Sequence, residues 1–299
     1  MVVDVIKVVS WNIAKRQEPW RELVKMDADV ALLQEAGDPP WNLTDKVDTG
    51  PQEHWDSHLW NSNWYRRHGW RYIADRWPKV VRLSDRVEIE WFDQDGPRGS
   101  GSQGTIPVSG AGNIAVAKVK PLNSDQRPFL VASIYASWIG ARPTAFSKWR
   151  VGMPDGSAHR AISDLSVFVG DADPLTYRIL AAGDLNMDYG WTDDEPLGLG
   201  ARERSVWDRF KALGFEYLGP QHPNGRQPNP APKHLPPDTK NVSTFRSNYM
   251  SPMTAQLQLD HVFASRGFHE GIKTRALNCV CQWGSSDGGE WVIRPRFAV

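Results

Sequence analysis

The chain has little cysteine, no net charge and no long uncharged apolar run, and each absence narrows what it can be. Its two cysteines, Cys279 and Cys281, are separated by one residue, so they can neither staple a long loop nor match a zinc-binding spacing. A reducing, intracellular setting is the modest inference. The first residues lack the basic region, apolar core and cleavage site of a secretory signal, and no stretch approaches membrane-spanning length. We expect a soluble, cytoplasmic protein.

Lysine and arginine together number 35, as do aspartate and glutamate, so no global field draws the chain to nucleic acid or to an anionic membrane. Any such attraction must come from a local patch. A length of 299 residues, 40% of them hydrophobic, is enough for a substantial core. Large α/β sheets often form a single unit, and the sequence shows no internal repeat and no linker. We therefore expect one domain over residues 1–299.

A strand–helix–strand unit is predicted near the N-terminus. Residues 5–12 are a β-branched run that ends on Asn12, and residues 30–35 are a second apolar run that ends on Glu35. Pro19 lies between them, at the expected start of a short helix. A crossover this short indicates an α/β architecture.

The stretch 178–188 ends in the same way. An apolar strand runs into Gly183 and stops on Asp184, and Asn186 follows two residues later. Side chains at i and i+2 of an extended chain point the same way, so this carboxylate and this carboxamide can reach one point. Aspartate and asparagine also end strands simply because they favour turns, so the pair is weak evidence by itself.

The other expected elements are strands at 113–119, 129–135, 243–245, 256–263 and 291–293 and helices at 159–169 and 203–213. Tyr135 closes one of these strands, Asp260 lies within another, and Gly214 closes the second helix. Residues 95–112 are expected to form a loop or hairpin connection. Residues 219–241 contain seven prolines and must be a long irregular excursion, and loops of that length tend to be functional or mobile.

Residues 38–105 carry seven of the fifteen tryptophans, and between Trp64 and Arg86 the basic residues exceed the acidic ones by five. Basic residues interleaved with aromatics are what a single-stranded nucleic acid or a polyphosphate would use. The alternative is that the tryptophans belong to the core and the charges to a solvated face. The candidate substrate-binding residues away from the strand ends are Arg66, Arg67, Arg71 and Trp138.

Polar side chains gather at or near the ends of the predicted strands: Asn12, Glu35, Tyr135, Asp184, Asn186, Asp260 and Asp287. Such a set suits an oxygen-ligand metal site that acts on a phosphate, because a hard cation such as Mg²⁺ takes oxygen ligands. Clustered carboxylates raise one another's pKa unless a cation neutralises them. One carboxylate binds a cation poorly, whereas several converging carboxylates bind it well.

These residues fall in motifs that resemble the ordered motifs of the endonuclease/exonuclease/phosphatase superfamily, which has the deoxyribonuclease I-like fold. The motifs are Trp11-Asn12, Gln34-Glu35, Ile134-Tyr135, Gly183-Asp184-Leu185-Asn186, Thr244-Phe245, Leu259-Asp260-His261-Val262 and Trp283-Gly284-Ser285-Ser286-Asp287. The resemblance leaves 38–105 and 219–241 unmatched. It implies a four-layered α/β sandwich, in which two packed mixed β-sheets are flanked by helices, and a Mg²⁺- or Mn²⁺-dependent phosphoesterase.

The same resemblance implies a metal half of the site. Glu35 resembles the principal metal ligand, and Asn12 and Asp287 resemble residues that hold the metal or its waters. Asp184 resembles the residue that orients or deprotonates the attacking water. Ala14 departs from those relatives that carry a further acidic ligand after the Trp-Asn motif, which puts a second metal in doubt.

The phosphate half is implied less completely. Asn186 resembles a residue that contacts the scissile phosphate, and Tyr135 stands where relatives carry Tyr or His beside that phosphate. Asp260 resembles the carboxylate that orients a catalytic histidine. In active relatives that histidine follows the last aspartate, but here Gly288 follows Asp287.

Gly288 admits three interpretations. It is a substitution made to trap substrate, a natural variant that relies on another group such as His54, His159 or His234, or the mark of a relative that binds without cleaving. His261 is a poor replacement, because it follows Asp260 directly on a strand and so points to the opposite face. We expect His261 to be packed within the sheet.

The leading hypothesis is a metal-dependent nuclease that hydrolyses phosphodiester bonds, with DNA as the expected substrate. The alternatives are a phosphoesterase for a small molecule or lipid headgroup, because one scaffold serves many phosphoesters, and a module that binds phosphate without chemistry.

Overall fold

The computed structural model describes residues 5–51, 78–96, 104–109, 114–122, 126–136, 154–169, 178–192, 199–245, 252–277 and 296–297. Within these ranges no helix is both long enough and apolar enough to cross a membrane.

A small sheet is built from β1 (Val8–Asn12), β2 (Val30–Gln34) and β3 (Lys79–Arg82), in that order. β1 and β2 are parallel and are connected by α1 (Glu18–Lys25), which has Pro19 in its first turn. The predicted strand–helix–strand unit is therefore confirmed. β3 pairs antiparallel with β2, so the region that no motif matched contributes a strand to the sheet.

A large sheet has the strand order β10-β11-β9-β8-β7-β4. Its strands are β4 (Val87–Trp91), β7 (Ile114–Pro121), β8 (Phe129–Tyr135), β9 (Ile179–Asp184), β10 (Phe215–Gly219) and β11 (Asp260–Ser265). β8 and β9 are parallel and the other neighbours are antiparallel. The remaining elements are α5 (Pro154–Leu165), α6 (Leu199–Ala212), the strand pairs β5 (Asp93–Asp95) with β6 (Thr105–Pro107) and β12 (Ile272–Lys273) with β13 (Arg296–Phe297), and the 3-10 helices η1 (Trp41–Leu43), η2 (Ser166–Phe168), η4 (Pro252–Thr254) and η5 (His269–Gly271).

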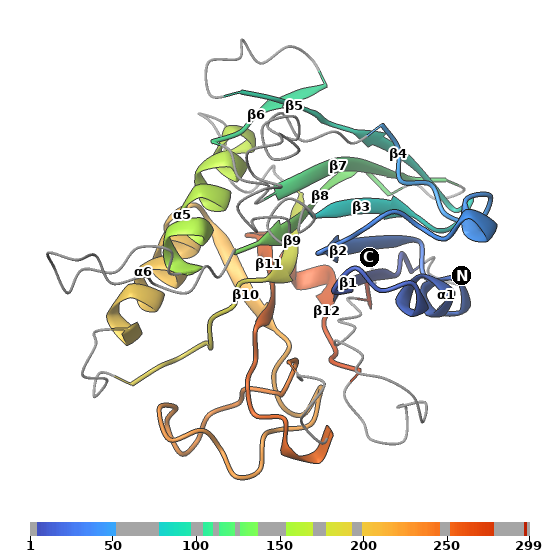
Figure 1. Cartoon of the computed structure of the whole chain (residues 1–299). Helices are drawn as coiled ribbons and strands as arrows, with labels where there is room; N and C mark the ends of the chain where they lie inside the picture. Colours follow the sequence, from blue (N-terminus) through green and yellow to red (C-terminus); the bar gives the residue numbers. More distant parts are fainter. Residues whose placement is uncertain are drawn as a thin grey trace, which may run out of the picture.

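The elements stack in four layers, and a separate apolar cluster fills each of the three interfaces. Figure 1 shows α5 and α6 on the left, α1 on the right and the two sheets between them. Phe210 of α6 stacks on Phe263 of β11 with ring centroids 3.9 Å apart. Trp20 of α1 packs against the outer face of the small sheet. The predicted four-layered sandwich of two mixed sheets is confirmed.

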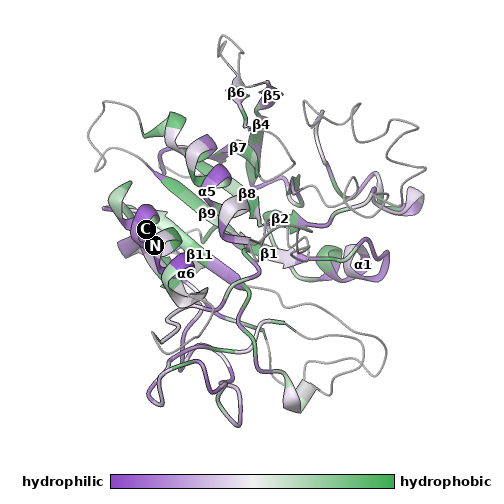
Figure 2. Ribbon diagram, turned by 60° about the vertical axis from the view of Figure 1, so that its left-hand side comes forward, coloured by the Kyte–Doolittle hydropathy of each residue, from purple (hydrophilic) through white to green (hydrophobic). Residues whose placement is uncertain are grey.

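Strand alternation assigns side chains to these interfaces. On β9, Leu180 faces the small sheet whereas Ala181 faces the helices. On β2, Leu32 faces the large sheet whereas Leu33 faces α1. Both strands are thus buried on both faces, which explains why they read as unbroken apolar runs. Figure 2 shows green, hydrophobic strands in the middle of the molecule and more polar loops around them.

Several predicted boundaries move. The helix expected at 159–169 begins earlier, as α5, and ends at Leu165, where the 3-10 helix η2 follows. α6 also begins earlier than expected and ends at Ala212, two residues before Gly214, which has a positive φ of 82°. The strand expected from 256 begins only at Asp260. The strand expected at 243–245 does not form; the Thr244 amide instead donates to the Leu257 carbonyl across a loop.

Residues 219–241 are irregular, as predicted, apart from a single bridge between Gln221 and Asn241. The strand expected at 291–293 lies outside the described residues.

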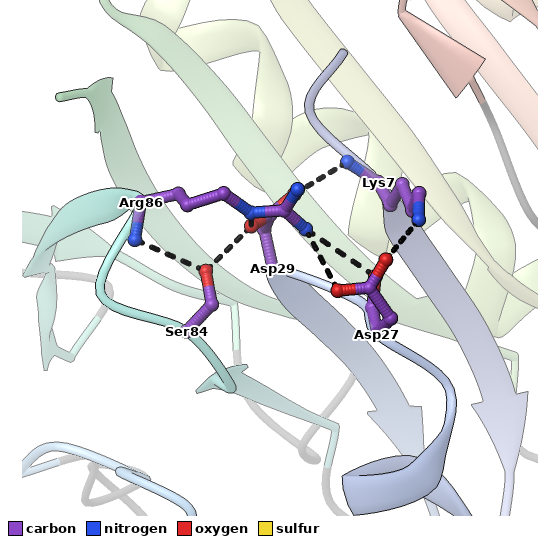
Figure 3. A network of polar contacts seen from close by, with 5 residues as sticks. All are labelled: Lys7, Asp27, Asp29, Ser84 and Arg86. Carbon is purple, nitrogen blue, oxygen red and sulfur yellow. Dashed lines mark hydrogen bonds and ion pairs between the residues drawn. The ribbon is translucent and has the colours of Figure 1, made fainter. Parts of the chain in front are cut away.

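A buried carboxylate connects the starts of β1 and β2 to the turn after β3. These starts lie at the opposite end of the small sheet from Asn12 and Gln34. Asp29 is fully buried and accepts hydrogen bonds from the Lys7 amide at 2.7 Å, from Ser84 Oγ at 2.5 Å and from Arg86 Nε at 2.7 Å (Figure 3). Asp27 takes part only from the rim, where its exposed carboxylate pairs with Lys7 and Arg86. This network is a structural brace.

The described part of the basic region is neutralised by pairing. Lys79 pairs with Asp38 and Arg82 with Asp48, each at 3.0 Å, and Arg86 pairs with Asp29. These three cations therefore already have carboxylate partners. The candidate residues Arg66, Arg67 and Arg71 lie outside the described residues.

We predict that Asp29→Asn lowers the free energy of unfolding by about 1–3 kcal/mol, because it turns a donor toward the Arg86 and Ser84 donors in a buried site. The matched change Asp27→Asn, on a carboxylate that is 72% exposed, should cost less than about 1 kcal/mol. Urea denaturation of both variants measures the difference. Equal losses would show that Asp29 is not a brace.

Candidate active site

The predicted polar residues meet where the ends of five strands come together. β1 and β2 finish side by side, with Asn12 opposite Gln34. In the large sheet the last residues of β8 and β9, Tyr135 and Asp184, are register partners, and Asp184 also pairs with Asp260 at the start of β11. The same edge of both sheets therefore carries the candidate site.

Asp184 lies at the centre of this edge, and both of its carboxylate oxygens are held. Asn12 Nδ2 donates to Asp184 Oδ2 at 2.9 Å, across the gap between the two sheets. The Asn186 backbone amide donates to Asp184 Oδ1 at 2.8 Å. The carboxylate is nearly buried, at 5% exposure. Its orientation is therefore set by Asn12 of the small sheet and by the segment that follows β9.

Glu35 follows β2 directly and reaches the large sheet through a phenol. Tyr135 donates its hydroxyl hydrogen to Glu35 Oε1 at 2.9 Å. Glu35 has a left-handed backbone with φ of 48°, which is uncommon for glutamate and costs energy unless the surroundings impose it. The Lys15 amide donates to the Glu35 carbonyl at 2.9 Å and helps to impose it. Strained backbone of this kind gathers at functional positions.

Asn186 is the second left-handed residue at the site, with φ of 51°. Its Nδ2 donates to the Ala136 carbonyl at 2.9 Å, just beyond the end of β8. The carboxamide is therefore fixed between the segments that follow β8 and β9. An asparagine side chain has two N–H donors, so one remains to meet a ligand.

Asp260 stands beside Asp184 in a buried position. Burial and then the negative charge of Asp184 raise the pKa of Asp260 well above its ordinary value, against a smaller opposing effect of the Thr244 hydroxyl. Its Oδ1 has no hydrogen-bond partner among the described residues. Two carboxylates forced together in this way favour the arrival of a cation or of a hydrogen-bond donor.

The donor set suits a hard cation only in part. No group of three or more His, Cys, Asp or Glu side chains within the described residues is placed to hold a metal ion. Mg²⁺, however, is usually held by one or two carboxylates and keeps several waters. The oxygen donors of Glu35 and Asn12, together with the negative charge of Asp184, fit that mode. The predicted ligand Asp287, like Gly288 and Trp138, lies outside the described residues.

The histidines are placed unequally. His261 is fully buried; it donates from Nε2 to the Met187 carbonyl at 2.8 Å and accepts from the Tyr217 hydroxyl at 3.2 Å. Burial lowers the pKa of His261 to about 4, so the ring is neutral. It is packed on the helix-side face, as expected. His159 lies between α5 and α6, with Nε2 2.9 Å from Ser205 Oγ.

His234 lies closer to the site strands. Its Nε2 is 2.8 Å from Asp188 Oδ2, and the other oxygen of Asp188 accepts from the Gln258 amide at 2.7 Å. Asp188 follows β9 and Gln258 precedes β11, so the contact anchors the proline-rich segment to both strands that carry site carboxylates. From the sequence, His234 was named only as one of several histidines, and Asp188 was not predicted.

Polar residues buried between the sheets were also not predicted from the sequence. Gln34 Nε2 donates to Ser133 Oγ at 2.9 Å, and both residues are fully buried. Gly183 lies against this pair: a Cβ there would meet the Ile134 carbonyl oxygen at 1.8 Å and Gln34 Nε2 at 2.9 Å, so no larger residue fits. A glutamine and a serine inside otherwise apolar runs were the available signal.

Glu203 of α6 gives a pH test of the region around Asp188. Burial, then the charges of Asp188 and Asp155, raise the pKa of Glu203 to about 9. Between about pH 4.5 and 9 the folded chain therefore keeps a proton that the unfolded chain releases, and stability falls as pH rises through that window. Glu203→Gln carries no such proton. We predict that the variant gains stability over the natural chain progressively from pH 5 to pH 9.

Urea denaturation at pH 5, 7 and 9 measures this gain. Glu22→Gln, at an exposed position of α1, controls for the change of residue type. Parallel pH profiles for Glu203→Gln and the natural chain would contradict the prediction.

Comparison with known proteins supports the fold. No protein-family model matches the chain, and no curated protein matches it by sequence. Among solved structures, the Xenopus laevis APE2 catalytic domain is similar with a TM-score of 0.57 and 14% identity, over 98% of this chain and 92% of that one. The Neisseria 3′ phosphatase NExo, bound to product DNA hairpin, has a TM-score of 0.55 and 13% identity, over 98% and 99% of the chains.

The endonuclease domain of TRAS1, a telomere-specific non-LTR retrotransposon, is similar with a TM-score of 0.54 and 15% identity, over 96% of this chain and 97% of that one. These neighbours are endonuclease/exonuclease/phosphatase proteins. The chain therefore has the deoxyribonuclease I-like fold of that superfamily, which confirms the resemblance seen in the sequence at the level of the fold.

Proposed function

We propose that this chain is a divalent-metal-dependent phosphodiesterase that hydrolyses nucleic acid, with DNA as its substrate. The observation that carries the proposal is the convergence of Asn12, Asp184 and Asn186 through direct hydrogen bonds at one edge of the two sheets. The fold of the similar nucleases and phosphatases supports it. The DNA hairpin bound to NExo favours DNA over a small phosphoester.

In this proposal Asp184 is the residue that orients the attacking water and accepts its proton. Each carboxylate oxygen accepts a hydrogen bond, one from the Asn12 side chain and the other from the Asn186 backbone amide, so the carboxylate is held in one orientation. Fixed donors keep the carboxylate pointed at one place without reorganisation during the reaction. Removing a general base commonly costs about 10²–10⁴-fold in rate.

Glu35, Asn12 and Asp287 would hold the metal ion, Mg²⁺ or Mn²⁺. When bound, the ion would neutralise charge that develops on the phosphate oxygens. Tyr135 contributes by holding Glu35 through its hydroxyl. Tyr135 is therefore assigned the role of positioning the Glu35 carboxylate. Contact with the phosphate is assigned mainly to the second side-chain N–H of Asn186.

Substrate contacts beyond the reacting phosphate are assigned to Trp138, Arg66, Arg67 and Arg71. These residue types suit a nucleic-acid strand, because guanidinium groups bind phosphates and indole rings stack on bases. The pairing of Lys79, Arg82 and Arg86 with carboxylates removes those three cations from this role.

Gly288 stands where the resemblance expects a histidine beside Asp260. We propose that the absence of this histidine lowers the rate of this chain by about 10²–10⁴-fold, the usual cost of losing a positioned acid–base group.

We predict that Gly288→His nicks supercoiled plasmid DNA in Mg²⁺ and that chelation stops it. Within that background, Asp184→Asn should slow nicking by about 10²–10⁴-fold, and Glu35→Ala should abolish it. Glu88→Gln, an exposed glutamate paired with Lys120 on the edge strand β4, is the matched control and should leave the rate unchanged. The measurement is the initial rate of nicked-circle formation.

Three outcomes would overturn the proposal. Cleavage that survives Glu35→Ala would remove the assigned metal site. Release of phosphate from inositol phosphates or nucleotides, with DNA untouched, would select a small phosphoester. Magnesium-dependent DNA binding without turnover by the Gly288→His chain would select a binding module.

A further inference from the structure

The interface between the two sheets changes character along its length. Over most of its area it is apolar, as at Val8, Leu32 and Leu180. Toward the candidate site it becomes polar: Ser10, Gln34 and Ser133 are all fully buried there. Strand alternation places Ser10 and Gln34 on the same inward face as Val8 and Leu32, so these side chains point at the large sheet.

Two of these residues bind each other across the interface. Gln34 Nε2 donates to Ser133 Oγ at 2.9 Å and to the Leu32 carbonyl at 3.1 Å. Ser133 in turn donates to the Leu33 carbonyl at 2.8 Å. Each sheet thus both gives and receives a hydrogen bond, which fixes β2 against β8 along the strand direction. Apolar contacts alone are non-directional and leave that offset less defined.

The residues next in sequence are the ones that need this offset. Glu35 follows Gln34, and Tyr135 lies two residues after Ser133 on the same face of β8. Tyr135 and Glu35 then make the second cross-sheet contact, at 2.9 Å. A slip of one sheet against the other would break this contact and release the left-handed conformation of Glu35.

The side-chain amide of Gln34 also lies against β9, the strand that ends at Asp184. A Cβ at Gly183 would lie 2.9 Å from Gln34 Nε2, and the Ile134 carbonyl oxygen, at 1.8 Å, excludes it outright. Gln34 therefore lies against β8 and β9 together, immediately before the residues at which both strands end.

Stability alone does not account for this bridge. Gln34 Oε1 has no hydrogen-bond partner in the described chain, so burying the amide carries an uncompensated cost. Replacing both partners of a buried polar pair by apolar groups of similar shape is often neutral or stabilising. Polar groups kept in such a place are better explained by the conformation that they specify.

We propose that Gln34 and Ser133 are positioning residues that set the offset between the two sheets and so hold the Glu35 carboxylate in place relative to Asp184. This inference rests on the proposed function, because the group being positioned is the assigned metal ligand. Neither residue touches substrate or metal in this account.

The test is the double variant Gln34→Leu with Ser133→Ala, which removes both partners at similar volume, in the natural and the Gly288→His chains. We expect kcat for DNA cleavage to fall about 10–100-fold, and the Mg²⁺ concentration for half-maximal activity to rise by a similar factor, as when residues that support metal ligands are changed. KM for DNA should stay within about twofold, and the urea midpoint should not fall.

Ser10→Ala is the matched control. Ser10 is buried on the same face of the small sheet, and its Oγ has no partner in the described structure, so its removal breaks no cross-sheet bond. It should leave kcat, KM and the Mg²⁺ requirement unchanged. If the double variant fails to fold, Ser133→Ala alone must show the same direction of change in kcat and in the Mg²⁺ requirement.

A crystal structure of the double variant separates this inference from the proposed function. We expect the Tyr135 hydroxyl to leave hydrogen-bond distance of Glu35 and the Glu35 φ to leave the left-handed region. Retention of both would overturn the inference even if no chain cleaves DNA. Loss of both in a chain without activity would support the positioning role and count against the proposed function alone. Unchanged kcat and Mg²⁺ requirement would also overturn it.

Discussion

The hydrogen bond from Asn12 to Asp184 is the interaction on which the candidate site depends, because it joins the two sheets where their polar strand ends meet. The sheets are brought together by apolar packing, which is strong but does not define their mutual offset. Polar contacts at one edge supply that definition. Asn12 reaches Asp184, Tyr135 reaches Glu35, and Gln34 reaches Ser133. The chemistry assigned to the site requires that all three hydrogen bonds form at the same offset of the two sheets.

The site stores unfavourable features that the rest of the fold maintains. Glu35 and Asn186 hold left-handed backbones, and the carboxylates of Asp184 and Asp260 sit side by side in a buried place. Each feature opposes folding to a modest degree and persists only because surrounding structure over-determines it. The brace around Asp29, at the opposite end of the small sheet, does the reverse, since every contact there relieves charge. One end of the small sheet thus carries the candidate site, and the other end carries contacts that stabilise the fold.

The sequence predicted those features that depend on local pattern. Unbroken apolar runs that stop on a polar residue located β1, β2, β8 and β9, and strand alternation correctly placed His261 away from Asp260. Contacts between segments far apart in the chain were not predictable in this way. Gln34 and Ser133 are 99 residues apart and Asp188 and His234 are 46 apart, and no periodicity relates such pairs. β3 was not predicted, because it lies in a segment rich in tryptophan and charge. Its charged residues, Lys79 and Arg82, pair with Asp38 and Asp48, which lie far from them in the sequence.

The central claim is that Glu35, at the joint between the sheets, belongs to a cation site. Anomalous diffraction from crystals grown with Mn²⁺ tests it most directly, because the ion is located without any assay of activity. The account predicts the strongest anomalous peak within coordination distance of the Glu35 carboxylate. A peak elsewhere, for example at the Asp27 carboxylate, with none at Glu35, would contradict it.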